Sequence, residues 1–413
     1  MRGSTTHLAR VVPRGAYMLA LKARGELVEG SLEELREELY MVMRATQYII
    51  NCLWELDILP TINQLHQMFY KLLRKQGFRA HQSKQIYKYA LFIVKSARKN
   101  NGKKPELKKI TVRLDKYDAK VDLENQLIVV KLRSRVFKIK LLHNSSYIRK
   151  FIGRKWYEVI ISIDRQGRIW LAIPFRCEYK PYKPKRIISL DINLRKIVVY
   201  DGKNVRRIDT KFVKALSLKV HAERIQKKYP RMWRYNEQIL DRVRSLHKCS
   251  RNMVVDWCRK FAKYIVLKAR RTVSAIVLED LEKLWFNVSK KSSSIADKLS
   301  RFAYRKLQLA IITKAIEYNV PILFVNPKGT STTCPRCGYK LSYNYRLAIC
   351  SSCGFIADRD SIGAMNIYLR VHRGMWGSQG SLPNALPMND ETRGRGRTLD
   401  EPMTSHIKTY TSI

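Results

Sequence analysis

The chain is poor in acidic residues and has no long apolar run. It carries 34 Asp plus Glu against 81 Lys plus Arg, a formal net charge of +47 over 413 residues with a sequence pI near 10.2. A charge of that size favours binding to polyanions. No uninterrupted apolar run approaches the roughly 20 residues of a membrane-spanning helix. Hydrophobic residues make up 45% of the chain, which excludes a merely disordered basic tail, and the length predicts two or three packed units.

The N-terminal residues show no signal peptide and no lipidation motif, which weighs against an oxidising compartment. The positive charge leaves two kinds of polyanionic partner, nucleic acid and the surface of a membrane. Nucleic acid is favoured, because no anchoring segment accompanies the charge. The expected location is the cytoplasm, in association with a prokaryotic nucleoid.

Cysteine is scarce, and half of the eight cysteines lie in one short stretch, "CPRCGYKLSYNYRLAICSSCG". They form a C-x2-C-x12-C-x2-C pattern: Cys334, Cys337, Cys350 and Cys353. Two residues between thiolates let both sulfurs point at one ion, and tetrahedral zinc needs two such turns. Gly338 and Gly354 follow the second cysteine of each pair, where a knuckle turn favours positive φ. Two disulfides or four unrelated thiols are the alternatives; the expected compartment favours one structural Zn²⁺. The other four cysteines lack such spacing: Cys52, Cys177, Cys249 and Cys258.

The first half of the chain changes its hydrophobic period twice. Residues 11–22 predict an apolar strand, and 31–100 repeat apolar residues at helical intervals. From 108 to 176 the period becomes two, which indicates strands with Asp, Asn and Gly at the turns. A Pro- and Lys-rich linker follows at 178–186. A helical block is therefore inserted into a small β domain.

Two features of the helical block bear on structure and function. Ser31 and Glu34 have the spacing of a capping box at the start of the first helix. Tyr87 and Tyr89 are interleaved with a basic run on the third helical stretch. That run is either a solvated helix face or a surface on which tyrosines stack with nucleic acid.

The second half of the chain has the pattern of an α/β domain. Strands are predicted at 187–191, 197–202, 273–280 and 321–325, of which 273–280 is expected to be buried. Helices are predicted over 211–271, 301–318 and 361–370. Residues 372–413 are rich in Gly, Ser, Pro, Asn and Arg, and we expect them to be disordered.

The helical segment at 211–271 is strongly basic. It contains eighteen Lys or Arg against four Asp or Glu. Its apolar residues recur mostly at intervals of three and four positions. This spacing predicts a helical hairpin with one apolar seam and a cationic outer surface. Contact with nucleic acid is favoured over a merely solvated face. The candidate contacts are Arg242, Arg244, Arg251, Arg259 and Lys263.

Three acids stand out by their position. Asp191 and Glu279 each end an apolar strand, and Asp360 precedes the last predicted helix. In an α/β sheet, strand ends and helix starts face one crevice. Carboxylates gathered there repel one another unless a cation neutralises them, and hard oxygen ligands suit Mg²⁺. Three unrelated surface acids remain the alternative on position alone.

The order of these elements resembles the split RuvC-like nuclease domain of the TnpB family of transposon-encoded RNA-guided DNA endonucleases, which are similar to type V CRISPR effectors. The matching segments are "IISLDINL", "IVLEDL", "VNPKGTSTTCPRCG" and "DRDSIGAMNI". The resemblance is specific over about 185–371 and weaker over 11–180. It implies an α+β multidomain chain whose RuvC-like domain has the RNase H fold and carries an inserted helical hairpin and a zinc ribbon. It also implies an N-terminal β wedge domain with an inserted helical recognition lobe.

The resemblance also implies domain boundaries. The wedge domain would comprise 1–30 and 101–180, and the recognition lobe 31–100. The nuclease domain would comprise 181–371, with its helical insertion at 211–271 and its zinc ribbon at 330–357.

The implied activity is Mg²⁺-dependent cleavage of target double-stranded DNA beside a short adjacent motif. The catalytic and Mg²⁺-binding triad would be Asp191, Glu279 and Asp360, with two Mg²⁺ ions. A guide RNA from the transposon end would supply sequence specificity by base pairing. The alternatives are a nuclease-impaired, guide-dependent repressor and a zinc-ribbon RNA-binding protein of ribosomal type. The latter explains neither the placed acids nor the length.

Two positions depart from the family pattern. Asn193 stands where Gly is usual, a mild change because Asn tolerates left-handed geometry. Ile362 stands where Asn is expected, which would remove a polar group beside the metal site. Asp280 and Asp358 adjoin the triad but do not occupy the matching positions.

Overall fold

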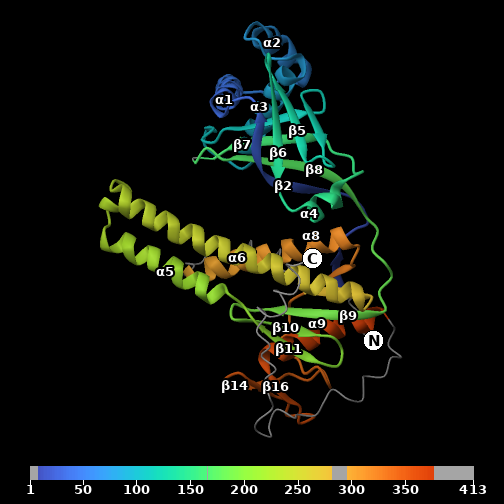
Figure 1. The fold of residues 1–413 in the computed structure, drawn as a ribbon. Coiled ribbons are helices and arrows are strands. Elements are labelled where there is room, and N and C mark those ends of the chain that lie inside the picture. Colours follow the sequence, from blue (N-terminus) through green and yellow to red (C-terminus); the bar gives the residue numbers. More distant parts are fainter. Residues whose placement is uncertain (1–7, 165, 281–294, 376–413) are drawn as a thin grey trace. The chain divides into compact units, whose positions relative to one another are not determined.

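The computed structural model describes residues 8–164, 166–280 and 295–375 (Figure 1). The chain divides into two compact units, one spanning Ala16–Cys177 and the other containing Met1–Gly15 and Glu178–Ile413. The sequence predicts a disordered tail over 372–413, but residues 372–375 continue the last helix, and residues 376–413 lie outside the described residues. Within the described ranges, none of the helices combines the length and apolar character needed to cross a membrane.

The unit Ala16–Cys177 contains a seven-stranded sheet and a three-helix block. The strands are β2 Gly15–Glu29, β3 Thr111–Asp115, β4 Ala119–Asp122, β5 Leu127–Leu132, β6 Arg135–Leu142, β7 Glu158–Ile163 and β8 Ile169–Tyr179. Their order in the sheet is β3-β7-β8-β2-β6-β5-β4. The helices are α1 Leu32–Trp54, α2 Ile62–Lys75 and α3 Ala80–Lys99, with a short α4 at Ser145–Ile148 and a 3-10 turn at Arg149–Phe151.

The helical block begins where the sequence predicts. Ser31 caps α1, its side chain accepting the backbone N–H of Glu34 at 3.1 Å, and the Glu34 carboxylate accepts the Ser31 N–H at 3.3 Å. This reciprocal pair satisfies two backbone donors that a helix start leaves unbonded. The predicted capping box is confirmed.

The second unit is built on a six-stranded sheet ordered β1-β13-β12-β9-β10-β11. Its strands are β1 Leu8–Val11, β9 Arg186–Ile192, β10 Lys196–Tyr200, β11 Val205–Asp209, β12 Ser274–Glu279 and β13 Ile322–Val325. Strands β9, β10 and β11 form an antiparallel meander, and β12 runs parallel to both β9 and β13. Strand β1 pairs antiparallel with β13. Residues 8–11 therefore lie in this unit, whereas the sequence predicted them in the N-terminal β domain.

Helices cover both faces of this sheet. They are α5 Phe212–Lys228, a 3-10 turn Met232–Arg234, α6 Glu237–Arg271, α8 Ile295–Tyr318 and α9 Arg359–Met375. Figure 1 shows α6 and α8 on one face and α9 on the other. The central strand β12 is consequently apolar on both faces and buried along Ser274–Leu278. Ile367 of α9 packs in one cluster with Val277 and Val325.

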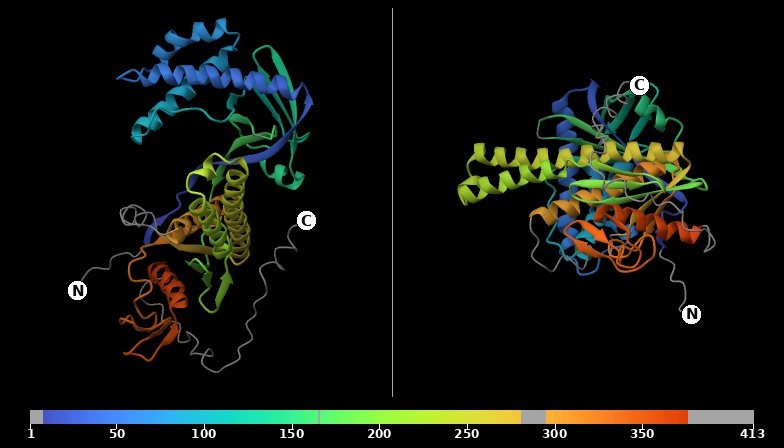
Figure 2. Two further views of the ribbon diagram at one scale, coloured as in Figure 1. Left: turned by 90° about the vertical axis from the view of Figure 1, so that its left-hand side faces the viewer. Right: turned by 90° about the horizontal axis from the view of Figure 1, so that it is seen from below.

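Helices α5 and α6 form the predicted hairpin. Ala222 of α5 packs with Val243 and Leu246 of α6 in a small apolar cluster. Figure 2 shows the two helices running side by side and projecting beyond the sheet on which α6 also packs. The hairpin therefore has an apolar seam of its own and presents the rest of its surface outward.

A small three-stranded sheet lies between β13 and α9 in the chain. Its strands are β14 Ser342–Asn344, β15 Leu347–Ile349 and β16 Ile356–Asp358, in the order β14-β15-β16. Strand β16 leads directly into α9. The cysteine-bearing segment is thus an insertion between the sheet and the last helix.

Candidate functional site

The structure brings the three predicted carboxylates to one region. Asp191 lies near the end of β9, Glu279 is the last residue of β12, and Asp360 is in the first turn of α9. Because β12 runs parallel to β9, their carboxyl ends share one edge of the sheet. Burial, together with the negative charges of Glu279 and Asp360, raises the pKa of Asp191 to about 7. Glu279 and Asp360 therefore lie close enough for their charges to act on Asp191.

Neighbouring polar groups orient two of these carboxylates. The Asn193 side-chain amide donates to Asp191 Oδ2 at 3.0 Å, and the Thr330 hydroxyl donates to Glu279 Oε1 at 2.7 Å. Burial raises the pKa of Glu279, while the Thr330 bond and the charge of Arg370 oppose that rise. The sequence did not single out Thr330, although it lies in the motif leading into the cysteines. Asn193 acts through its side chain, and it is absent from the positive-φ positions of the described residues.

Helix α9 approaches Asp191 closely at Gly363. A Cβ placed on Gly363 would lie 2.8 Å from Asp191 Oδ2 and 3.0 Å from Asp191 Cγ. Contacts this short force the carboxylate or the helix to move. Gly363 therefore allows α9 to bring Asp360 toward the strand ends, which explains a glycine inside a helix.

Gly363→Ala is expected to move the Asp191 carboxylate and to lower any activity that depends on it by more than tenfold. Overpacking costs about 1–3 kcal/mol, whereas alanine gains about 1 kcal/mol of helix propensity over glycine. The free energy of unfolding should therefore fall by no more than about 2 kcal/mol. Thermal unfolding measures the loss of stability, and an assay of that activity measures the second effect separately.

The control for this variant is the same substitution in an Asp191→Ala background. With the carboxylate removed, Gly363→Ala should become neutral or stabilising, because only the helix propensity remains. An equal destabilisation in both backgrounds would show that the alanine clashes elsewhere.

Asp360 is held by an arginine from the cysteine-bearing segment. Arg346, in the turn between β14 and β15, forms ion pairs with Asp360 and, at 3.6 Å, with Asp358. The Asp360 N–H also donates to Asp358 Oδ2 at 3.2 Å. In the described part of the chain, the cysteines are the group of three or more candidate ligands whose donor atoms all lie within 4.8 Å.

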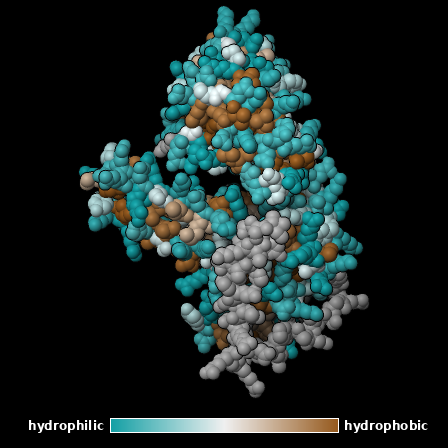
Figure 3. All heavy atoms as spheres, in the orientation of Figure 1, coloured by the Kyte–Doolittle hydropathy of each residue, from teal (hydrophilic) through white to brown (hydrophobic). Residues whose placement is uncertain are grey.

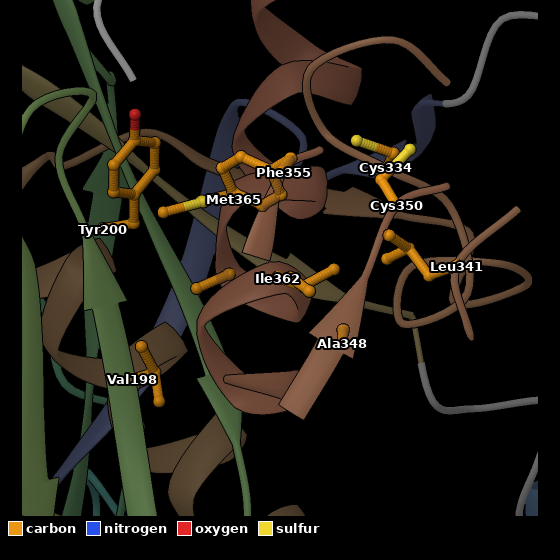
Figure 4. Packing of buried hydrophobic residues seen from close by; sticks show 10 residues of the cluster. Val198, Tyr200, Cys334, Leu341, Ala348, Cys350, Phe355, Ile362 and Met365 are labelled. Atoms are coloured by element: carbon orange, nitrogen blue, oxygen red, sulfur yellow. The ribbon is translucent and has the colours of Figure 1, made fainter. Parts of the chain in front are cut away.

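Ile362 lies in an apolar cluster. It is fully buried and packs with Val198, Tyr200, Ala348 and Phe355 (Figure 4). Figure 4 shows its side chain between strand β10 and the cysteine-bearing segment. The prediction that Ile362 removes a polar group beside the metal site stays a prediction, and the structure shows that the surroundings of Ile362 are apolar. An asparagine here would bury an amide among apolar side chains.

The four cysteines form a compact cluster. Their sulfurs lie within 4.8 Å of one another, with Cys337 and Cys350 3.4 Å apart and Cys334 and Cys353 3.7 Å apart. In each pair the glycine N–H donates to the first cysteine's carbonyl at 2.9 Å, with φ of 80° at Gly338 and 70° at Gly354. Thus the predicted knuckle turns are present. The cluster could bind one zinc ion.

The cluster of thiols adjoins the helix that carries Asp360. Buried Cys334 and Cys350 pack in the same apolar cluster as Ile362 and Met365 of α9. The Asn366 side chain donates to the carbonyls of Thr330 at 2.7 Å and Thr333 at 2.8 Å. These contacts link the thiol cluster, the Thr330 loop and the start of α9.

The predicted nucleic-acid contacts divide into two groups. All five candidates on α6 are exposed: Arg242, Arg244, Arg251, Arg259 and Lys263. Figure 3 shows hydrophilic residues over much of the visible described surface.

Tyr87, by contrast, is 1% exposed, and its hydroxyl lies 3.1 Å from His66 Nδ1. It packs inside the helical block and cannot stack on a ligand from the surface. Tyr89 is half-buried, with the Arg113 guanidinium 4.9 Å from its ring centroid.

The fold is that of the Cas12 effectors, mixed α/β multidomain proteins. The chain aligns with Cas12f1, solved by cryo-EM in complex with sgRNA and target DNA, at a TM-score of 0.55 and 13% identity. The alignment covers 86% of this chain and 99% of Cas12f1. The Cas12f1-like TNB domain family matches residues 304–367, which include the four cysteines.

Sequence relatives define the family. A TnpB-like protein of Methanocaldococcus jannaschii is 30% identical over 239 residues, which are 54% of this chain and 83% of that protein. A second TnpB-like protein of that organism is 24% identical over 330 residues, covering 76% of this chain and 74% of that protein. The chain belongs to the TnpB-like family. It is also 23% identical over 212 residues to the CRISPR-associated endodeoxyribonuclease Cas12f1 of Syntrophomonas palmitatica, covering 47% of this chain and 41% of that protein.

Proposed function

We propose that this protein is a transposon-encoded, RNA-guided, Mg²⁺-dependent DNA endonuclease. The observation that carries the proposal is the convergence of Asp191, Glu279 and Asp360 in a TnpB-like chain, with Gly363 admitting α9 against Asp191. The unit from Glu178 onward would be the RuvC-like nuclease domain, and Ala16–Cys177 the wedge domain with its helical recognition lobe.

The topology of the six-stranded sheet supports this assignment. An antiparallel meander, β9-β10-β11, is followed by β12 and β13, which run parallel to β9. The RNase H fold that we propose for this domain orders its strands in the same way. The α5–α6 hairpin enters between β11 and β12, and the cysteine-bearing segment between β13 and α9. Both insertions leave the carboxyl ends of β9 and β12 together.

The residues present fit magnesium. The donors are carboxylate oxygens, which Mg²⁺ prefers. Burial, and after it the negative charges of Glu279 and Asp360, raises the pKa of Asp191, and a bound divalent cation would stabilise its charged form. Asp191, Glu279 and Asp360 would hold the metal. Two bound Mg²⁺ ions would supply activation of a water and stabilisation of the leaving oxygen of a phosphodiester.

The chain's own groups would prepare that chemistry. Asn193 fixes the rotamer of Asp191, and Thr330 fixes that of Glu279, each through a hydrogen bond. Gln308 donates to the Glu279 carbonyl at 3.0 Å and so holds the end of β12 against α8. Arg346 would release Asp360 for metal binding when a nucleic-acid phosphate competes for its guanidinium.

The partners follow from the charge and the relatives. The net charge of +47 suits a chain that grips nucleic-acid backbones, and the aligned Cas12f1 structure contains sgRNA and target DNA. A guide RNA from the transposon end would pair with one DNA strand, so that base pairing reads the sequence while the protein reads a short adjacent motif.

The proposal is tested by purifying the protein with its bound RNA and sequencing that RNA. The complex is then incubated with Mg²⁺ and a DNA library that carries the matching target beside randomised flanking bases. Cleavage confined to targets beside one short motif is the expected result. Tight binding of guide and target without metal-dependent cutting would falsify the nuclease proposal.

One observation favours a second candidate, a guide-dependent repressor with an impaired nuclease. Arg346 forms an ion pair with Asp360, one of the three proposed metal ligands. If Arg346 does not release Asp360, the chain binds its target without cutting it. The cleavage assay separates the two candidates directly.

Binding of the protein to nucleic acid is expected to weaken steeply with salt. If six or more phosphates are neutralised, log affinity should fall against log salt with a slope of about −5 or steeper. Charge reversal at Arg242, Arg251 and Lys263 should flatten that slope, because all three are exposed on α6. Fluorescence anisotropy at several salt concentrations measures it.

The matched control removes acids from the same helix. Asp241→Asn and Asp256→Asn release Arg244 and Lys260 from their ion pairs, so the slope should stay as steep or become steeper. An unchanged slope after the charge reversals would place the hairpin away from the nucleic acid.

A further inference from the structure

A pocket of about 390 Å³ lies in the unit Ala16–Cys177, whereas the carboxylates and the four cysteines belong to the other unit. It is bordered by the turn between β3 and β4, by β4 and β5, and by the segment before β7. Its lining includes three lysines and two aromatic residues: Lys116, Tyr117, Lys120, Lys131 and Trp156. This combination differs from an apolar cavity, and it pairs flat rings with positive charge.

The ring of Tyr117 is held in place from the helical block. It is 55% exposed, yet the His81 ring stacks on it with centroids 3.9 Å apart and planes inclined by 20°. Asp115 fixes both partners, because its Oδ2 lies 3.3 Å from His81 Nδ1 and its Oδ1 accepts the Tyr117 N–H at 2.9 Å. An exposed aromatic ring with a fixed orientation loses little entropy when a flat ligand stacks on it.

The charge around the pocket is positive. The two acids of the β3–β4 turn are engaged on the protein side, Asp115 beside His81 and buried Asp118 with Arg79 at 2.6 Å. Within the described ranges, no ion pair occupies the ammonium groups of the three lining lysines. The Lys116 ammonium lies 5.2 Å from the Tyr117 ring centroid, so the cation and the ring are presented together.

We propose that this pocket binds one unpaired nucleotide of a single-stranded nucleic acid. The base would stack on Tyr117 and contact Trp156, while Lys120 and Lys131 bind the flanking phosphates. Stacking on aromatic side chains beside cationic groups is the usual recognition of single strands, whose bases are accessible. A duplex keeps its bases paired and offers no such face. The proposal rests on the proposed function only in taking nucleic acid as the partner, and it assigns a site that cleavage itself does not require.

The test measures binding of the full-length protein to short unstructured oligouridine RNA and to oligothymidine DNA by fluorescence anisotropy. Tyr117→Ala should weaken binding about 5- to 100-fold, the range found when a stacked aromatic is removed. Tyr117→Phe keeps the ring and should bind within about twofold of wild type. Lys120→Ala and Lys131→Ala should each reduce the salt slope by about one. If Tyr117→Ala weakens binding of oligouridine, the nucleotide comes from RNA. If it weakens binding of oligothymidine, the nucleotide comes from DNA.

Tyr157→Ala is the matched control. Tyr157 is 43% exposed and follows Trp156 in the chain, but it does not line the pocket. Its removal should change neither oligomer's affinity. Crosslinking of 4-thiouridine RNA or 4-thiothymidine DNA, followed by peptide mapping, should mark the peptides that contain Tyr117 or Trp156. A Tyr117→Ala protein that melts as wild type and binds both oligomers unchanged would overturn the proposal.

These outcomes are independent of the nuclease proposal. If wild-type protein cuts guided targets while Tyr117→Ala has no effect on single-strand binding, the pocket proposal fails and the nuclease proposal stands. If Tyr117→Ala weakens binding while wild-type protein cuts nothing, the pocket proposal stands and the nuclease proposal fails.

Discussion

Asp191→Ala, Glu279→Ala and Asp360→Ala, made one at a time, are each expected to abolish Mg²⁺-dependent cleavage of guided target DNA. Loss of one carboxylate would leave a metal under-coordinated where the charge of the leaving oxygen develops. Several kcal/mol of transition-state stabilisation depend on that metal, and about 1.4 kcal/mol corresponds to a tenfold rate. The expected loss is about 10³-fold or more, measured as single-turnover cleavage of a labelled target.

Binding of guide and target should persist in all three variants. The carboxylates lie at strand ends, whereas the predicted backbone contacts are basic and exposed on α6. A triad variant that loses both binding and cleavage would indicate misfolding. Asp191→Asn distinguishes misfolding from loss of a metal ligand, because asparagine keeps the shape of the side chain. It replaces a buried carboxyl group whose pKa is raised to about 7.

Neighbouring acids serve as controls. Asp280 follows Glu279 but forms an ion pair with Arg10 at 3.4 Å. Asp358 precedes Asp360 by two residues and accepts its N–H, a role that an asparagine oxygen can keep. Asp280→Asn and Asp358→Asn should therefore retain cleavage. If either control is as inactive as Asp191→Ala, the assignment of the triad is wrong.

Cys350→Ser is expected to release zinc and to destabilise the start of α9. Structural zinc contributes about 10–16 kcal/mol in isolated zinc-finger peptides at neutral pH. Cys350 is buried and shares its apolar cluster with Ile362 and Met365 of α9, so the loss should reach the helix that positions Asp360. Elemental analysis should fall from one zinc per chain to none, with a lower thermal midpoint and reduced cleavage.

The matched control is Cys249→Ser, because Cys249 is an exposed thiol outside the cluster. It should leave the zinc content, the thermal midpoint and cleavage unchanged. Wild-type protein that contains no zinc after purification without chelator would contradict the assignment, as would a Cys350→Ser protein that keeps its zinc.

The local chemistry of this protein is determined by the sequence itself. The spacing of the cysteines and the glycines after them is enough to predict the knuckle turns, because each turn is closed within a few residues. The capping box at Ser31 is equally local. The net charge needs no fold to indicate a polyanionic partner.

The tertiary structure alone decided which face of an element each residue presents. Helical spacing allowed Tyr87 to face solvent, but packing of α3 in the helical block buries it. The sequence could not show that Ile362 turns toward the thiol cluster while Gly363 turns toward Asp191. Residues 8–11 likewise join a sheet whose partner strand, β13, lies more than three hundred residues further along the chain. Such outcomes depend on contacts between distant segments, and hydrophobic periodicity reports that a face is buried without saying against what.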